Sequence, residues 1–149
     1  MSTTISTLND LIETLKDGQD GFRAASEAVR SSNLKTVFNE YSLQRSKFAG
    51  ELQALAHSVG EKNPESTGSV AAAMHRGWIN LKSAVTSHDD HAILAECERG
   101  EDSAVAEYQK ALESDGLPGN VVQTIQTQFA AVQAAHDRVR DLRDSLASP

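Results

Sequence analysis

The segment "LKTVFNEYSLQRSKFAGELQALAHSV" (residues 34–59) carries an unbroken stripe of mostly apolar side chains. The stripe alternates spacings of four and three residues, which places its members on one face of an α-helix. Its members are Leu34, Phe38, Tyr41, Arg45, Phe48, Leu52, Leu55 and Val59. The segment therefore predicts a long amphipathic helix with one charged residue, Arg45, on its inner face.

Three further long segments show the same spacing, at about 5–30, 90–114 and 118–146, and a shorter one covers about 69–86. Breaks occur at "SSN" (31–33), "GEKNPESTGS" (60–69) and "SDGLPGN" (114–120). Two helical hairpins joined by an extended connection are typical of ferritin-like bundles. We therefore expect an all-α, ferritin-like four-helix bundle, with a short crossover helix between helices two and three, as one domain over residues 1–149.

Composition is that of an ordinary globular protein, with 39% hydrophobic and 23% charged residues. No apolar run approaches the roughly 20 residues that a membrane span requires. The amino terminus lacks the pattern of a cleavable signal peptide. Because Cys97 is the single cysteine, an internal disulfide is excluded. A cytoplasmic setting without membrane contact is therefore expected.

The net charge of −7 is concentrated in residues 88–115, which hold nine acids and two bases. No basic stripe exists that would follow a nucleic-acid backbone, so we expect no nucleic-acid partner. The acidic third helix could instead meet a basic protein partner. A homo-oligomer is also compatible with the sequence.

Four polar residues interrupt the apolar stripes near the midpoints of their helices: Gln19, Arg45, Glu101 (with Glu98 one turn earlier) and His136. Midpoints meet in antiparallel hairpins, so the sequence predicts one polar layer halfway along the bundle. The acids nearby are expected to lie in water or at the helix start; they are Asp89, Asp90, Glu96, Asp102 and Glu107.

This layer has two interpretations. Ferritin-like di-iron sites use glutamates from two helices and Glu-x-x-His pairs from the other two. Here "ALAH" (54–57) and "QAAH" (133–136) keep the histidine and lose the glutamate. A guanidinium stays charged and repels a cation, so Arg45 favours a buried Arg–Glu–His network and no cofactor. The alternative is an iron or zinc site formed by Glu98, Glu101 and His136.

Several segments resemble a bacterial family of ferritin-like four-helix-bundle proteins defined by domain of unknown function 2383. They are "LNDLIETLKDGQDGFRAASE" (8–27), "HRGWINLK" (75–82), "ILAECERGEDSAVAEYQKAL" (93–112), "LP" (117–118) and "AHDRVRDLRD" (135–144). The resemblance implies a ferritin-like fold, a distant relationship to rubrerythrins and a bacterial, cytoplasmic setting. It implies no activity.

The sequence thus predicts a non-enzymatic helical-bundle protein with no catalytic residues. A link to bacterial stress rests on analogy with ferritin-like relatives. The alternative function is a metal-binding ferritin-like protein with a redox or storage role.

Overall fold

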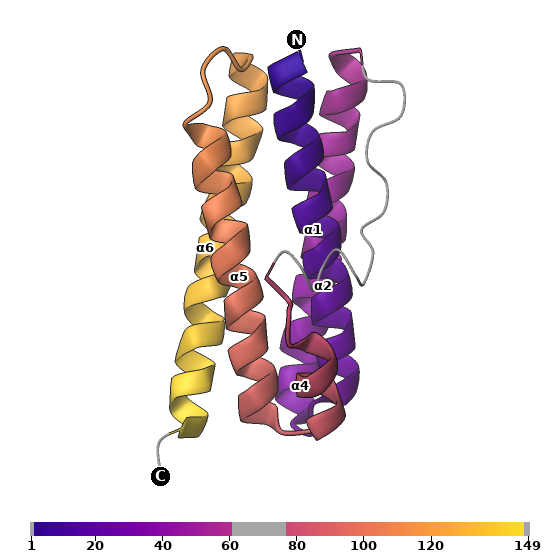
Figure 1. Ribbon diagram of the computed structural model, residues 1–149, viewed down its shortest axis with the longest axis vertical. Helices are drawn as coiled ribbons and strands as arrows, with labels where there is room; N and C mark the ends of the chain where they lie inside the picture. Colours follow the sequence, from indigo (N-terminus) through magenta and orange to yellow (C-terminus); the bar gives the residue numbers. More distant parts are fainter. Residues whose placement is uncertain (1, 61–76, 148–149) are drawn as a thin grey trace.

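The computed structural model describes residues 2–60 and 77–147 (Figure 1). These residues form four long helices and one short helix, and they contain no β-strand. The helices are α1 (Ser2–Ala28), α2 (Ser32–Ser58), α4 (Leu81–Ser87), α5 (Asp90–Leu112) and α6 (Gly119–Ala147). The prediction of four long helices from apolar spacing is therefore confirmed, with ends that shift by a few residues.

The long helices pair as two antiparallel hairpins, α1 with α2 and α5 with α6 (Figure 1). The hairpins meet mainly through α1 and α5, whereas α2 and α6 contact each other over a short stretch only. In Figure 1, α2 rises towards the end of the bundle where α1 begins, and α5 rises in the same direction. The end of α2 and the start of α5 therefore lie at opposite ends of the bundle (Figure 1).

Carboxylates at the start of α5 fix the loop between α1 and α2. The side chain of Asp90 accepts hydrogen bonds from the backbone N–H groups of Arg30 at 2.7 Å and Ser31 at 3.0 Å. Its neighbour Asp89 caps α5 by accepting from the N–H of His91 at 3.0 Å. Negative charge is favourable there because a helix amino terminus carries partial positive charge.

The core consists of two apolar clusters. One cluster contains Phe22, Phe38 and Trp78, and the ring centroid of Phe22 lies 5.8 Å from that of Phe38 and 5.4 Å from that of Trp78. The other contains Leu8 and Tyr108. None of the helices in the two described ranges has an apolar stretch long enough to cross a bilayer.

Within the predicted crossover helix at 69–86, residues 77–80 form a turn, and α4 begins at Leu81. The cause of this turn is local, because Gly77 has a φ of +130°, which is incompatible with a helix and rarely adopted by other residues. The apolar residues Trp78 and Leu81 are buried, and residues 69–76 of the predicted helix lie outside the described residues.

Trp78 lies between two glycines, one from each hairpin. A Cβ atom added to Gly21 of α1 would lie 2.6 Å from the indole, and one added to Gly100 of α5 would lie 2.2 Å from it. Real Cβ atoms essentially never approach so closely. Both positions therefore require glycine as long as the indole occupies this place.

The buried face of α6 is rotated relative to the predicted one. In the sequence, spacings of three and four residues put Phe129 and His136 on the inner stripe with Ile125 and Val132, but Gln128 and Ala135 are buried instead, 1% and 2% exposed. Phe129 and His136 lie at the border of the core and are partly buried. Gln128 can be buried because its side-chain amide forms hydrogen bonds, one of which it accepts from the hydroxyl of Tyr108.

Candidate functional site

A buried ion pair joins α2 and α5 between the two apolar clusters. Both terminal nitrogens of Arg45 donate to the carboxylate of Glu101, with 2.6 Å between Nη2 and Oε2. The two side chains are 1% and 0% exposed. Bidentate pairing is the strongest arrangement available to a guanidinium and a carboxylate. The predicted contact between Arg45 and Glu101 is therefore present.

Helix α1 makes room for the guanidinium and offers it an aromatic face. A Cβ atom on Gly18 would lie 3.4 Å from Nη1 of Arg45, so only a small residue leaves this space open. The ring of Phe22 lies 5.2 Å from the guanidinium carbon, within cation–π range. The Nε atom donates to Oε1 of Gln44 at 3.1 Å. The buried Oε1 atom of Gln19, also expected in this layer, has no hydrogen-bond partner among the described residues.

Burial and pairing act in opposite directions on these groups. Burial alone would lower the pKa of Arg45, but the charge and hydrogen bonds of Glu101 raise it above its usual range. Arg45 therefore stays charged, and the pair is neutral as a whole. Burial also raises the pKa of the Cys97 thiol well above its usual value. A buried, protonated thiol is chemically inert, as expected for a core cysteine.

A second buried polar chain connects α5, α6 and α2. The hydroxyl of Tyr108 donates to Oε1 of Gln128 at 2.7 Å. Nε2 of Gln128 then donates to the carbonyl of Phe48 at 3.2 Å and to Oε1 of Glu51 at 2.9 Å. Burial raises the pKa of Tyr108, so its phenol remains a donor. The sequence did not point to Gln128, because one glutamine beside a phenylalanine leaves no signal in an apolar pattern.

Glu98 and His136 do not join the buried pair. Glu98 accepts a hydrogen bond from Arg143 of α6, and 13% of its side chain is exposed. Nε2 of His136 lies 2.6 Å from Oδ1 of Asp102. The expected single layer is thus divided into a pair inside the core and a partly exposed group along the seam between α5 and α6.

This second group, the seam cluster, consists of Glu98, Asp102 and His136. One ligand atom from each residue lies within 4.8 Å of those from the other two. Glu98 and Asp102 are four residues apart, so they share a face of α5, and His136 reaches them from α6. Two of the three predicted metal-ligand candidates are therefore close together, whereas Glu101 lies in the core and Asp102 takes its place. Metal binding here stays a prediction.

The buried layer does not fit a di-iron centre. Such a centre needs glutamates from two helices and Glu-x-x-His pairs from two others. Glu101 gives both of its oxygens to Arg45, whose fixed positive charge would repel iron. His57 of "ALAH" is exposed near the end of α2, and His136 of "QAAH" faces the seam. The donor set that the ferritin-like expectation requires is absent from the described core.

Glu96 was expected in water, and this prediction is wrong. Its side chain is 2% exposed, and its oxygens accept from the N–H of Asn80 at 2.9 Å and from Nη1 of Arg99 at 2.6 Å. Burial raises the pKa of Glu96, against the opposing effects of these two donors. The carboxylate thus fixes the turn before α4. The sequence gave no sign of this role, because the partner amide lies in another element.

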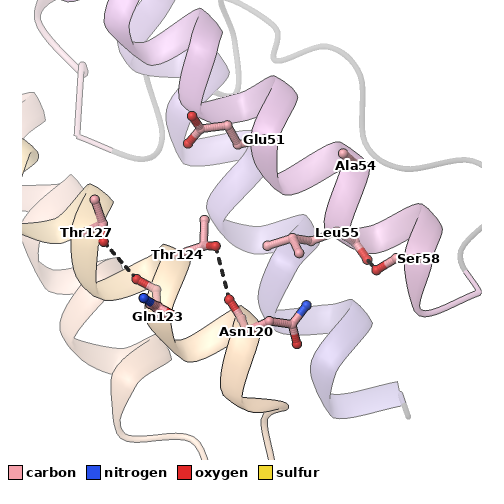
Figure 2. Close-up of a pocket in the computed structure, with 8 residues that line it drawn as sticks. All are labelled: Glu51, Ala54, Leu55, Ser58, Asn120, Gln123, Thr124 and Thr127. Carbon is pink, nitrogen blue, oxygen red and sulfur yellow. Dashed lines mark hydrogen bonds between the residues drawn. The ribbon is translucent and has the colours of Figure 1, made fainter.

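An open groove of about 650 Å³ runs between the ends of α2 and α6 (Figure 2). Glu51 and Ser58 line it from α2, and Thr124 and Thr127 line it from α6. Each hydroxyl already donates to a backbone carbonyl of its own helix; the Ser58 bond measures 2.6 Å. Figure 2 shows these bonds running along the helices and not into the groove. The groove therefore presents no paired acid and base.

Comparison with known proteins places most of the chain in a family. Residues 3–114 match the family model described as Domain of unknown function (DUF2383). The matched range includes Arg45, Glu101 and the Trp78 turn, and it ends before α6. A search of curated proteins found no match. The resemblance noted in the sequence is confirmed for this family.

Proposed function

Because the chain belongs to the DUF2383 family, whose description assigns no activity, we propose a role from its own residues. In this proposal it is a non-enzymatic bundle protein of the ferritin-like type. In this proposal the Arg45–Glu101 pair occupies the position of a di-iron centre. A bacterial, cytoplasmic setting and a link to stress belong to the same proposal and rest on the ferritin-like resemblance.

The observation that carries the proposal is the bidentate pair itself. A protein that used the bundle core for redox chemistry would need several carboxylates free to bind metal. Glu101 is instead neutralised on both oxygens by Arg45. The guanidinium replaces the metal as the positive partner of the carboxylate, and it carries no redox function.

The direction of the helices supports the ferritin-like part of the proposal. Ferritin-like folds differ from simple up-and-down bundles by one long crossover connection. Here α2 and α5 run in the same direction, so the end of α2 and the start of α5 lie at opposite ends of the bundle, as such a crossover would require (Figure 1).

Iron loading tests the proposal. Untagged protein purified without chelator and incubated aerobically with Fe²⁺ should hold fewer than the two irons per chain of a di-iron centre. It should also oxidise Fe²⁺ no faster than buffer. Glu101→Gln should leave both measurements unchanged, as should the matched control Glu107→Gln on the same helix. Two irons per chain, lost in Glu101→Gln alone, would contradict the proposal.

Without a catalytic centre, the protein would act through its surface, by binding a second copy or another protein. We extend the proposal to a basic protein partner that binds the acidic helix α5 and the residues after it. Glu107, Glu113 and Asp115 would provide the negative charges for this contact. Most of the other acids in this segment already bind groups within the chain, so these three carry the proposed contact.

Binding to poly-lysine should reveal this surface. Affinity should fall as salt rises past about 0.15 M, where charges are screened beyond roughly 8 Å. The variant Glu107→Gln/Glu113→Gln should bind several-fold more weakly, whereas the matched variant Glu27→Gln/Glu40→Gln on the other hairpin should change little. An affinity that does not change with salt, or that falls equally in both double variants, would exclude a specific binding surface at Glu107 and Glu113.

A further inference from the structure

We propose that the seam cluster of Glu98, Asp102 and His136 binds one divalent transition-metal ion, for which Zn²⁺ is a suitable probe. The site differs from a ferritin-like di-iron centre because two helices supply it and it lies outside the core. It is also independent of the proposed function, since a non-enzymatic bundle can carry a metal ion on its surface.

The geometry is close to that of a bound ion. The three donor atoms lie within 4.8 Å of one another. Bonds of about 2.0–2.2 Å in tetrahedral geometry would place the donors about 3.3–3.6 Å apart. The longest donor separation must therefore shrink by about 1 Å, and the 2.6 Å between His136 and Asp102 must widen by somewhat less, which rotation of Glu98 and Asp102 can provide. Asp102 is 64% exposed, so an ion can enter from solvent and keep water in its open position.

His136 is already held in a suitable orientation. Its Nδ1 atom lies 3.1 Å from Oδ1 of Asp137, which favours the tautomer with hydrogen on Nδ1. Nε2 lies 2.6 Å from Oδ1 of Asp102, so a proton on Nε2 is donated to that carboxylate when no metal is bound, and an ion placed between the two atoms would replace this proton. A carboxylate behind a ligating histidine is the usual outer partner in zinc sites. Burial alone would lower the pKa of His136, but the hydrogen bonds and charges of Asp137 and Asp102 raise it, as expected in anionic surroundings.

The positive charge nearest to the site has a second partner. Arg143 contacts Oε1 of Glu98 through Nη1, and its Nη2 donates to Oδ1 of Asp144 at 2.8 Å. Glu98 can therefore offer Oε2 to an ion while Arg143 keeps Asp144. Arg140 lies 3.5 Å from Asp137 and does not contact the three ligands in the structure.

The donor set determines the class of ion. One imidazole nitrogen with two carboxylate oxygens suits zinc, iron, nickel or copper. Calcium and magnesium prefer oxygen ligands throughout. We therefore expect selectivity for a transition-metal ion over Mg²⁺.

Calorimetric titration of the untagged, metal-free chain with Zn²⁺ tests the site. One ion should bind per chain. His136→Gln and Asp102→Asn should each weaken binding by at least about 10-fold, and Asp137→Asn should weaken it by about 10-fold at unchanged stoichiometry. Circular dichroism before each titration checks that the variants are folded. Zn²⁺ should also raise the melting temperature of the wild type but not that of His136→Gln.

Control variants separate this site from general attraction to acids. His91→Gln and Glu107→Gln on α5 should retain wild-type affinity, and excess Mg²⁺ should not displace Zn²⁺. Arg143→Gln should bind at least as tightly as the wild type, because a competing positive charge is removed. The proposal is overturned if no saturable binding occurs. It is equally overturned if His136→Gln and Asp102→Asn bind like the wild type, or if His91→Gln or Arg143→Gln abolishes binding.

Discussion

Arg45→Met should lower the free energy of unfolding by about 3–5 kcal/mol. Methionine fills much of the space of the arginine stem, so the loss comes mainly from Glu101. That carboxylate is fully buried and would lose the cation that balances it and both of its hydrogen-bond donors. Chemical denaturation followed by circular dichroism measures the loss, with an unchanged slope against denaturant showing that compactness is retained.

A second substitution, at Glu101, shows whether the loss comes from the unpaired carboxylate. Arg45→Met combined with Glu101→Gln should recover much of the loss, because no unpaired charge remains in the core. Arg140→Met on α6 is a matched control, since its contacts with Asp137 and Asp141 are at the surface and should be worth about 0–1 kcal/mol. If Arg45→Met costs no more than Arg140→Met, or if the double variant loses the sum of the single losses, the pair is not a coupled buried unit.

The location of this pair could be predicted because a charged residue on an apolar stripe leaves a clear signal. Arg45 and Glu101 each lie near the middle of a strongly periodic helix, and such midpoints coincide in antiparallel hairpins. His136 was misplaced because spacings of three and of four residues both fit a helix, so the stripe through Val132 can continue to Phe129 or to Gln128. A hydrogen bond from Tyr108, which no local pattern reveals, makes the second choice possible.

Other features depend on contacts between distant segments. The burial of Glu96 requires the N–H of Asn80, and the seam cluster requires the rotation of α6 that brings His136 to Asp102. Periodicity indicates which face of a helix is buried, but it leaves the edges of that buried face uncertain by about one residue. Carboxylates near such a border can therefore be placed only when the partner helix is known.

The packing of Trp78 against two glycines is the part of the fold that the sequence indicates least. Trp78→Ala should lower the free energy of unfolding by about 3–5 kcal/mol. The indole is 2% exposed and contacts the ring of Phe22 edge-on, with 5.4 Å between centroids. Its removal leaves a cavity between the hairpins that Gly21 and Gly100 cannot fill. Denaturation followed by circular dichroism gives the loss, because the variant lacks the single tryptophan needed for fluorescence.

Whether a glycine-to-alanine substitution raises or lowers the free energy of unfolding then tests whether the indole packs against that glycine. Alanine normally stabilises a helix interior by about 0.5–1 kcal/mol relative to glycine, and Gly50→Ala in α2 should show this gain because nothing lies within 4 Å of the added Cβ. Gly100→Ala should instead cost about 1–3 kcal/mol, because its Cβ would lie 2.2 Å from the indole. In the Trp78→Ala background the same change should become neutral or stabilising, since the obstructing ring is gone. Equal gains at Gly50 and Gly100 in the wild-type chain would mean that the indole does not pack against Gly100.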